Sequence, residues 1–167
     1  TPPEPVYLSI ATVLYRSDDA QLQHFRDSLV ASVQYLRHER PVARVSLAVV
    51  DNAAAEDGDR FSRLFTRLPG IDALRFIQPD HNLGYGKAHN LCMHQGSDFH
   101  LILNPDVYLS ADALLAGIDY LQTHPATGMV TPYGENDRGE PLFLSKRYPT
   151  VLDFLLRGFV PTGVRSL

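Results

Sequence analysis

Strands and helices alternate along this chain, and that alternation constrains its fold more than any other feature. Short apolar runs rich in β-formers predict four strands, at residues 6–15, 45–50, 73–77 and 99–103. Buried parallel strands have such continuous apolar runs, and the helices between them form right-handed crossovers. The sequence therefore predicts an α/β fold, a mostly parallel and doubly wound sheet with helices on both of its faces.

Helices are predicted where apolar residues recur at helical spacing or follow a capping residue. These helices start after Ser17, cover residues 61–68 and 84–95, and start again after Ser110. The first has its apolar face at Leu22, Phe25, Leu29, Val33 and Leu36. Beyond them we predict a fifth strand at Met129–Thr131, a polar turn at Gly134–Gly139 and a helical segment at Val151–Leu156.

Length, charge and cysteine content narrow the class of protein. A chain of 167 residues can bury a full core in one domain, and it has no apolar run of the ~18 to 20 residues that a membrane span needs. The net charge of −4 argues against a nucleic-acid partner. A single cysteine, Cys92, fits a reducing compartment. We therefore expect a cytoplasmic protein, whose three prolines within residues 1–5 indicate a loose leader.

Polar residues gather at the carboxyl ends of the predicted strands. They are Thr12, Tyr15, Asp51, Asn52, Asn82, Asn104 and Asp106. Open parallel sheets bind their ligands beyond these strand ends, at the point where the strand order reverses. The sequence therefore predicts a ligand site at this edge of the sheet.

Two glycines lie at the start of the predicted helix 84–95, in Gly84-Tyr85-Gly86. A dinucleotide-binding fingerprint would need a third glycine at position 89, where His89 stands, so that reading is disfavoured. A tight loop that leads into a helix is a purely structural explanation of the two glycines. Such a loop also lets the backbone and Lys87 approach a phosphate group.

The carboxylates at the strand ends have two interpretations each. Asn104-Pro105-Asp106 places an amide and a carboxylate together, and Mg²⁺ or Mn²⁺ binds one or two carboxylates and completes its shell with phosphate oxygens and water. The same composition is common in turns. Asp51 either ends its strand or accepts the N–H of a pyrimidine base. Both pairs of alternatives stay open at this point.

The motifs in their order resemble those of the family 2 inverting glycosyltransferases with the GT-A fold, particularly rhamnosyltransferase-like members. The matching segments are Ala11–Ser17, Val49–Ala53, Asn82–Asn90, Leu103–Val107 and Arg147–Thr150. Leu103–Val107 is similar to a variant of the family's Asp-x-Asp metal motif. The resemblance extends from about Val6 to Arg157. It implies a nucleotide-sugar-binding α/β domain at 6–133 and the incomplete start of an acceptor-side region at 134–167.

The resemblance implies a UDP-sugar or dTDP-sugar donor, a Mg²⁺ or Mn²⁺ ion, inversion at the anomeric carbon, and a saccharide or lipid-linked acceptor of the bacterial cell surface. It assigns nucleotide binding to Thr12, Tyr15, Asp51, Asn52, Asn82, Gly84, Lys87 and Asn104, and metal binding to Asp106. Asp51 would bind the base, Asn104 the ribose or a metal-bound water, and Lys87 would lie near the diphosphate. Peripheral attachment to the inner face of the membrane is a further expectation.

Two departures from the family's pattern shape these expectations. Asn104 replaces the first acid of the metal motif, and no residue has a recognisable catalytic-base motif. The resemblance implies an enzyme of ~250 residues or more, which is longer than this chain of 167 residues. We therefore expect the chain to be the donor-binding portion of a longer enzyme. The alternatives are a non-catalytic nucleotide-sugar-binding module that acts with a partner, and a nucleotidyltransferase. The apolar segment Val151–Leu156 either mediates a homo-dimer or folds back on the sheet.

Overall fold

The computed structural model describes residues 5–53, 63–93, 96–136 and 138–142. The chain divides into two compact units, Thr1–Gly128 and Met129–Leu167, and each is described by itself. The predicted segment Val151–Leu156 and most of the leader lie outside the described residues. In the described part, no helix has the length and apolar character needed to cross a bilayer.

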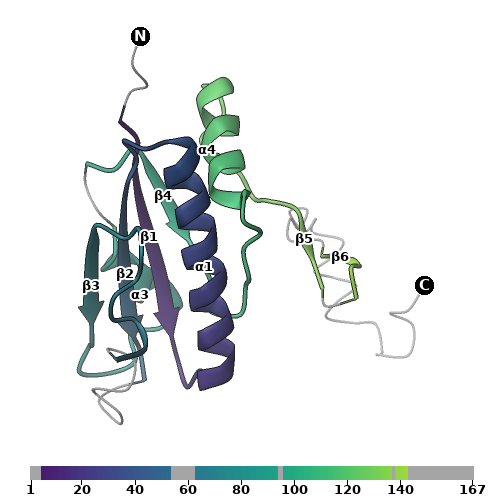
Figure 1. The fold of residues 1–167 in the computed structure, drawn as a ribbon. Coiled ribbons are helices and arrows are strands. Elements are labelled where there is room, and N and C mark those ends of the chain that lie inside the picture. Colours follow the sequence, from purple (N-terminus) through teal and green to yellow (C-terminus); the bar gives the residue numbers. More distant parts are fainter. Residues whose placement is uncertain (1–4, 54–62, 94–95, 137, 143–167) are drawn as a thin grey trace, which may run out of the picture. The chain divides into compact units, whose positions relative to one another are not determined.

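The first unit is built on a four-stranded parallel sheet (Figure 1). Its strands are β1 (Tyr7–Leu14), β2 (Arg44–Asp51), β3 (Ala73–Ile77) and β4 (Phe99–Ile102). Their order in space is β3-β2-β1-β4, so β1 lies in the interior of the sheet between β2 and β4. The four predicted strands and their parallel arrangement are confirmed.

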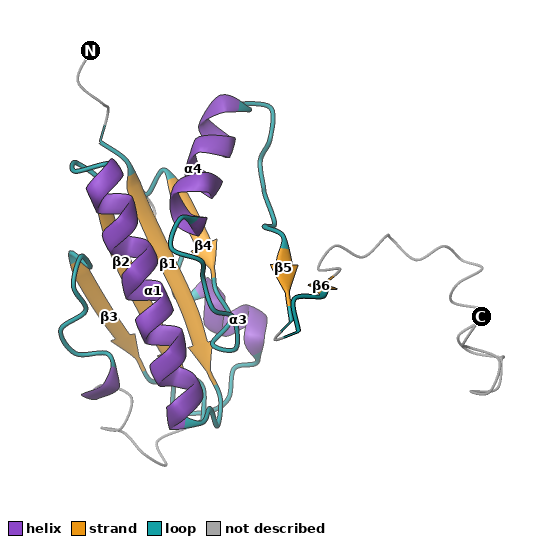
Figure 2. Cartoon of the chain, turned by 45° about the vertical axis from the view of Figure 1, so that its right-hand side comes forward, coloured by secondary structure: helices purple, strands orange, loops and turns teal. Residues whose placement is uncertain are grey.

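Helices cover both faces of this sheet. Helices α1 (Asp19–Glu39) and α4 (Ala113–Thr123) lie on one face, and the short helix α3 (Tyr85–Asn90) lies on the other (Figures 1 and 2). The predicted α/β fold with a doubly wound sheet is therefore confirmed.

The alternation of side chains along β1 supplies one core to each face. Leu8, Ile10 and Leu14 belong to a large apolar cluster with the buried side of α1, whereas Ala11 and Val13 belong to a smaller cluster with α3. Successive side chains of a strand point to opposite faces. The smaller second core explains why a helix as short as α3 suffices on that side.

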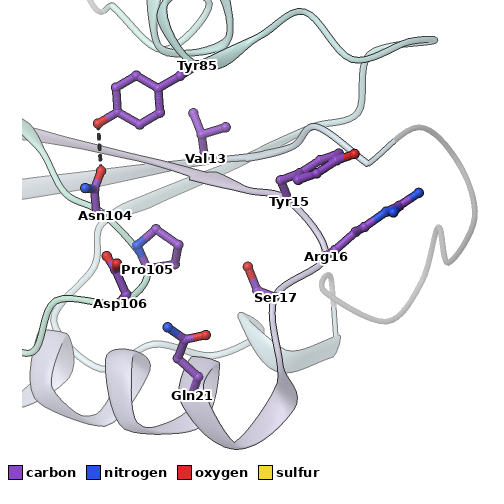
Figure 3. A pocket seen from close by; sticks show the side chains of 9 residues that line it. All are labelled: Val13, Tyr15, Arg16, Ser17, Gln21, Tyr85, Asn104, Pro105 and Asp106. Carbon is purple, nitrogen blue, oxygen red and sulfur yellow. Dashed lines mark hydrogen bonds between the residues drawn. The ribbon is translucent and has the colours of Figure 1, made fainter. Parts of the chain in front are cut away.

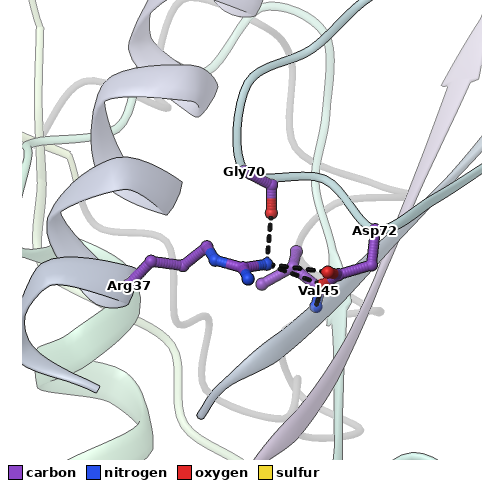
Figure 4. Close-up of polar contacts among 4 residues, drawn as sticks. All are labelled: Arg37, Val45, Gly70 and Asp72. Atoms are coloured by element: carbon purple, nitrogen blue, oxygen red, sulfur yellow. Dashed lines mark hydrogen bonds and ion pairs between the residues drawn. The ribbon is translucent and has the colours of Figure 1, made fainter. Parts of the chain in front are cut away.

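One polar cluster connects α1 to the amino-terminal ends of β2 and β3 (Figure 4). The Arg37 guanidinium donates from Nη1 to both carboxylate oxygens of Asp72, at 2.8 and 2.9 Å, and to the carbonyl of Gly70 at 3.0 Å. Asp72 Oδ2 also accepts the backbone N–H of Val45 at 2.7 Å. This cluster fixes the end of the sheet that lies opposite the predicted ligand site.

Both predicted serine caps are wrong. Asp18, not Ser17, caps α1, because its Oδ1 accepts the backbone N–H groups of Ala20 and Gln21 at 2.9 and 3.2 Å. Before α4, the Ser110 hydroxyl donates to the Asp112 carboxylate at 2.9 Å and does not accept from the helix. At α1 the neighbouring carboxylate of Asp18 accepts the bonds that a serine cap would have accepted. At α4 the Ser110 hydroxyl is engaged by the carboxylate of Asp112, two residues later.

The predicted helices differ from the observed ones in length. Helix α3 ends at Asn90, and Leu91 and Cys92 follow in a tighter turn whose N–H groups bond three residues back. Residues 94–95, at the predicted helix end, lie outside the described residues. Of the predicted helix at 61–68, residues 63–64 are helical and Phe65 is fully buried, packed edge-on against Phe25 with ring centroids 6.2 Å apart.

The predicted fifth strand at Met129–Thr131 is wrong. These residues pair with none of the strands in the part of the chain that the structure describes, and Met129 is 82% exposed. A small antiparallel hairpin of β5 (Gly134–Glu135) and β6 (Pro141–Leu142) follows instead. Asn136 Oδ1 organises its turn by accepting the N–H groups of Arg138 and Glu140. The predicted polar turn at Gly134–Gly139 thus lies largely within this hairpin.

Candidate functional site

A pocket of about 330 Å³ lies at the carboxyl ends of β1 and β4 (Figure 3). The chain after β1, the chain after β4 and the first turns of α1 and α3 supply its walls. The lining residues are Val13, Tyr15, Arg16, Ser17, Gln21, Tyr85, Asn104, Pro105 and Asp106. This is the edge of a parallel sheet at which α/β proteins bind their ligands.

The wall after β4 carries the pocket's acid. The N–H of Leu103 donates to Ala11 of β1 at 2.9 Å, and the N–H of Val107 donates to Asn104 at 3.2 Å, so a turn begins at once. Pro105 restricts the backbone of that turn. As a result Asn104 and Asp106 are both exposed and both line the pocket.

Tyr85 of α3 reaches across to this turn. Its hydroxyl donates to Asn104 Oδ1 at 2.6 Å (Figure 3). Partial burial raises the pKa of Tyr85, and the negative charge of Asp106 raises it further. The hydroxyl therefore keeps its proton at neutral and mildly alkaline pH and acts as the donor of this bond.

Arg16 supplies a positive charge after β1. Its backbone φ is 50°, a left-handed conformation that is uncommon for a residue with a side chain. Its guanidinium carbon lies 5.4 Å from the ring centroid of Tyr15, and the two side chains lie beside each other in Figure 3. Backbone strain of this kind clusters at functional sites, because the surrounding structure must hold it in place.

A second polar group lies at the carboxyl ends of β2 and β3. Asn52 donates from Nδ2 to Asn82 Oδ1 at 2.9 Å and accepts the N–H of Leu83 at 2.9 Å. Asn82 Oδ1 also accepts the N–H of Gly84 at 2.8 Å. These bonds hold the segment before α3 against the end of β2. Tyr85 follows directly, so the second group positions one wall of the pocket.

Asp51 belongs to this second group and is only 2% exposed. Its Oδ1 accepts the N–H of Ala53 at 3.1 Å, and its Oδ2 accepts the amide of Gln78 at 3.2 Å. Each carboxylate oxygen can accept a further hydrogen bond. A ligand N–H could therefore be added without breaking either contact.

Gly84 adopts a backbone conformation that favours glycine. Its φ is 74°, and a Cβ built there would meet nothing within 4 Å. Conformation rather than crowding accounts for glycine at this position, since only glycine adopts such angles at little cost. This confirms the expectation of a tight loop that starts a helix.

The structure brings some of the predicted site residues together and separates others. Tyr15, Asn104 and Asp106 line the pocket, whereas Asp51, Asn52, Asn82 and Gly84 form or adjoin the second group. Lys87 is exposed on α3 and does not line the pocket. Thr12 is fully buried, and its hydroxyl has no hydrogen-bond partner among the described residues. Their roles as nucleotide ligands stay predictions.

Sequence reasoning missed several residues of the site. Arg16, Ser17, Gln21 and Tyr85 line the pocket, and Gln78 bonds to Asp51. The position of Arg16 and Ser17 directly after a strand, and of Tyr85 between two glycines, could have indicated them. Gln21 is the third residue of α1, and no sequence motif indicates that it lines a pocket.

The residues present fit a divalent cation only in part. Among the described residues, no three His, Cys, Asp or Glu side chains form a group that could hold a metal ion. Asp106 offers one carboxylate, and the Asn104 oxygen already accepts from Tyr85. Such a donor set suits Mg²⁺ or Mn²⁺ when phosphate oxygens complete the shell.

Comparison with known proteins supports the fold. No protein-family model and no curated protein sequence matches the chain. The crystal structure of S. aureus TarS, residues 1–349, is similar, with a TM-score of 0.56 and 16% sequence identity. The match covers 76% of this chain and 38% of the TarS chain, so this chain spans well under half of that structure. TarS has a GT-A-like fold, and the likeness shows that this chain has the same type of fold.

Proposed function

We propose that this chain binds a nucleotide-diphosphate sugar and carries the donor side of an inverting, family 2-like glycosyltransferase. The pocket at the carboxyl ends of β1 and β4 is the main support, because it combines the Asp106 carboxylate with the Arg16 guanidinium in a GT-A-like fold. A carboxylate suits a cation and a guanidinium suits phosphate oxygens. A diphosphate–cation pair satisfies both.

In this proposal the diphosphate lies between Arg16 and Asp106. Asp106 would hold Mg²⁺ or Mn²⁺, which would offset the negative charge of the leaving diphosphate. The cation–π contact with Tyr15 favours a position of the Arg16 guanidinium beside the pocket. Lys87, exposed on α3, is the second cationic side chain assigned to the phosphates.

The base would bind at Asp51. Gln78 donates to the same carboxylate, and a uracil or thymine N3–H would add a further hydrogen bond. Cytosine has no hydrogen at N3, so it would leave the buried acceptor without that donor. A site built around such a bond discriminates strongly against a ligand that lacks it.

A second candidate function is nucleotide-sugar binding without transfer. Asp106 is the one carboxylate among the pocket-lining residues that the structure describes. Inverting transfer to a saccharide or lipid-linked acceptor needs a general base for the acceptor hydroxyl. If Asp106 holds the cation, the described pocket has no second acid to act as that base.

Calorimetry on the 167-residue chain tests the proposal. We expect UDP or dTDP to bind more tightly than CDP, and Mn²⁺ to strengthen binding relative to buffer with a chelator. Equal affinity for all three nucleotides, or no binding, would overturn it. Incubation with labelled UDP- and dTDP-sugars and a simple saccharide acceptor then separates the two candidates, because only a transferase yields labelled product.

A further inference from the structure

The Asn104 amide in the pocket has one end engaged and one end open. Its Oδ1 accepts the Tyr85 hydroxyl at 2.6 Å. Its Nδ2 has no hydrogen-bond partner in the part of the chain that the structure describes. An amide has a fixed acceptor and a fixed donor. The bond from Tyr85 therefore determines which of the two is left for a ligand.

The ring of Tyr85 also contacts the ring of His89. His89 lies one turn later on α3, and the two rings pack edge-on with centroids 4.4 Å apart. His89 is 4% exposed, and neither of its ring nitrogens has a partner among the described residues. Burial, and then the nearby His100, lower the pKa of His89, so its ring is neutral at pH 7. Tyr85 is 54% exposed, and these two contacts favour the orientation in which its hydroxyl reaches Asn104.

We propose that Tyr85 is a positioning residue that turns Asn104 into a hydrogen-bond donor, so that its NH₂ group binds a phosphate or ribose oxygen of the nucleotide. This inference rests on the proposed function. It also makes Asp106 the charged ligand for the cation, with one lone pair of the Asn104 oxygen already engaged by Tyr85.

The first test needs no ligand. NMR relaxation of the Asn104 side-chain NH₂ group reports how firmly the amide is held. We expect restricted motion in the wild type and increased motion in Tyr85→Phe. Tyr120→Phe is a matched control, because Tyr120 also contacts the ring of a histidine four residues later, with centroids 4.1 Å apart, but is not among the described residues that line the pocket. Unchanged relaxation in Tyr85→Phe would overturn the positioning role.

The second test is a double-mutant cycle on UDP affinity in buffer with a chelator. Tyr85→Phe and Asn104→Ala should each weaken binding about 3- to 10-fold, and the double variant should be no weaker than Asn104→Ala alone. Tyr120→Phe should bind as the wild type does. Effects of the two substitutions that multiply would overturn the inference. Melting temperatures within a few degrees of wild type confirm that the variants are folded.

A third variant separates the donor role from a structural one. Asn104→Asp can still accept from Tyr85 but has no NH₂ group. We expect UDP affinity without metal to fall as in Asn104→Ala, while the gain on adding Mn²⁺ grows. Full metal-free affinity in Asn104→Asp would contradict the donor role. If the wild type binds neither UDP nor dTDP, the proposed function is wrong and the donor role falls with it, whereas the relaxation measurement still decides whether Tyr85 holds the amide.

Discussion

A buried carboxylate that accepts hydrogen bonds from its own chain, as Asp51 does from Ala53 and Gln78, is a ready acceptor for a ligand as well. The carboxylate loses its hydration when the protein folds, so ligand binding does not have to desolvate it again. An added N–H donor therefore meets a desolvated acceptor, and hydrogen bonds to such charged groups are stronger than those in water.

Replacing Asp51 should remove base recognition. In Asp51→Ala we expect UDP affinity to fall by about 1.5 to 3 kcal/mol, the worth of a hydrogen bond to a charged group. The preference for UDP over CDP should disappear. Calorimetry with both nucleotides measures this. Gln78→Ala is the control, since it removes the internal bond but keeps the carboxylate, and it should retain the preference. A preference that survives in Asp51→Ala would show that another group reads the base.

Replacing Asp106 should remove the metal dependence. In Asp106→Asn we expect UDP binding without metal to stay within about 2-fold of wild type, and the gain from Mn²⁺ to vanish, because a neutral amide is a poor ligand for a hard cation. Titrations with and without Mn²⁺ measure both. Asp112→Asn changes a nearby acid that does not line the pocket and should keep the metal effect. Tight Mn²⁺ binding to the free wild-type protein would contradict this role of Asp106.

The sequence predicted some of the lining residues that follow strands but missed those that lie on helices. Tyr15, Asn104 and Asp106 follow strands directly, so the strand-end rule found them. Gln21 and Tyr85 lie on helices, and which helical turn faces a sheet edge depends on tertiary packing. Linear spacing does not contain that information.

The Arg37–Asp72 cluster shows how one element holds two others (Figure 4). Partial burial favours a higher pKa for Asp72, but hydrogen bonds from Arg37 and the Val45 N–H, with the charges of Arg37 and Arg44, outweigh it and lower the pKa. A carboxylate with a lowered folded-state pKa stabilises the fold above its unfolded-state pKa. That contribution is lost as pH falls through the folded-state pKa.

Removing this carboxylate should destabilise the sheet's amino-terminal end. Because the pair is partly exposed, we expect Asp72→Ala to lower the free energy of unfolding by only about 1 to 2 kcal/mol. Asp72→Asn should cost less, since its amide oxygen still accepts from Val45. Urea unfolding at pH 7 measures both. Asp27→Ala removes a looser exposed pair with Arg26, at 3.8 Å, and should change little. Equal effects of Asp72→Ala and Asp27→Ala would contradict the importance of this cluster.

The packing of α3 on the sheet should make stability depend on pH. Burial lowers the pKa of both His89 and His100. Unfolded histidines bind a proton near pH 6.5, so the unfolded state gains protons first, and stability should fall as pH drops below about 6.5. Unfolding at pH 7.5 and 5.5 measures the loss. It should shrink in His89→Leu and persist in His38→Asn, where the side chain is exposed. A loss unaffected by His89→Leu would place its origin elsewhere.

Element types were predicted more reliably than element ends. Apolar runs mark strands that are covered on both faces, and the interior strands β1 and β2 are largely buried in this way. The edge strands β3 and β4 are more exposed, but their runs of β-forming residues still identified them. The end of α3 and the cap of α1 depend on single hydrogen bonds, such as those that Asp18 accepts. Met129–Thr131 has the composition of a strand, but a strand exists only with a neighbour to pair with. The strand order likewise depends on partners distant in sequence.

At the scale of the molecule, the described residues that line the pocket all belong to the unit Thr1–Gly128. We expect a chain that ends at Gly128 to unfold cooperatively and to bind UDP within about 2-fold of the 167-residue chain. Circular dichroism during urea unfolding and calorimetry measure the two properties. A shortened chain that folds but binds much more weakly would show that residues beyond Gly128 contribute to the site.

The interior position of β1 has a consequence for biosynthesis. Leu8 pairs with Val45 on one side and with Phe99 on the other, so β1 leaves the ribosome about 90 residues before its last partner strand. At a translation rate of about 5 to 20 residues per second, one edge of β1 stays open for several seconds. Exposed strand edges invite pairing with other chains. A nascent chain of this protein should therefore depend on chaperones until β4 has been made.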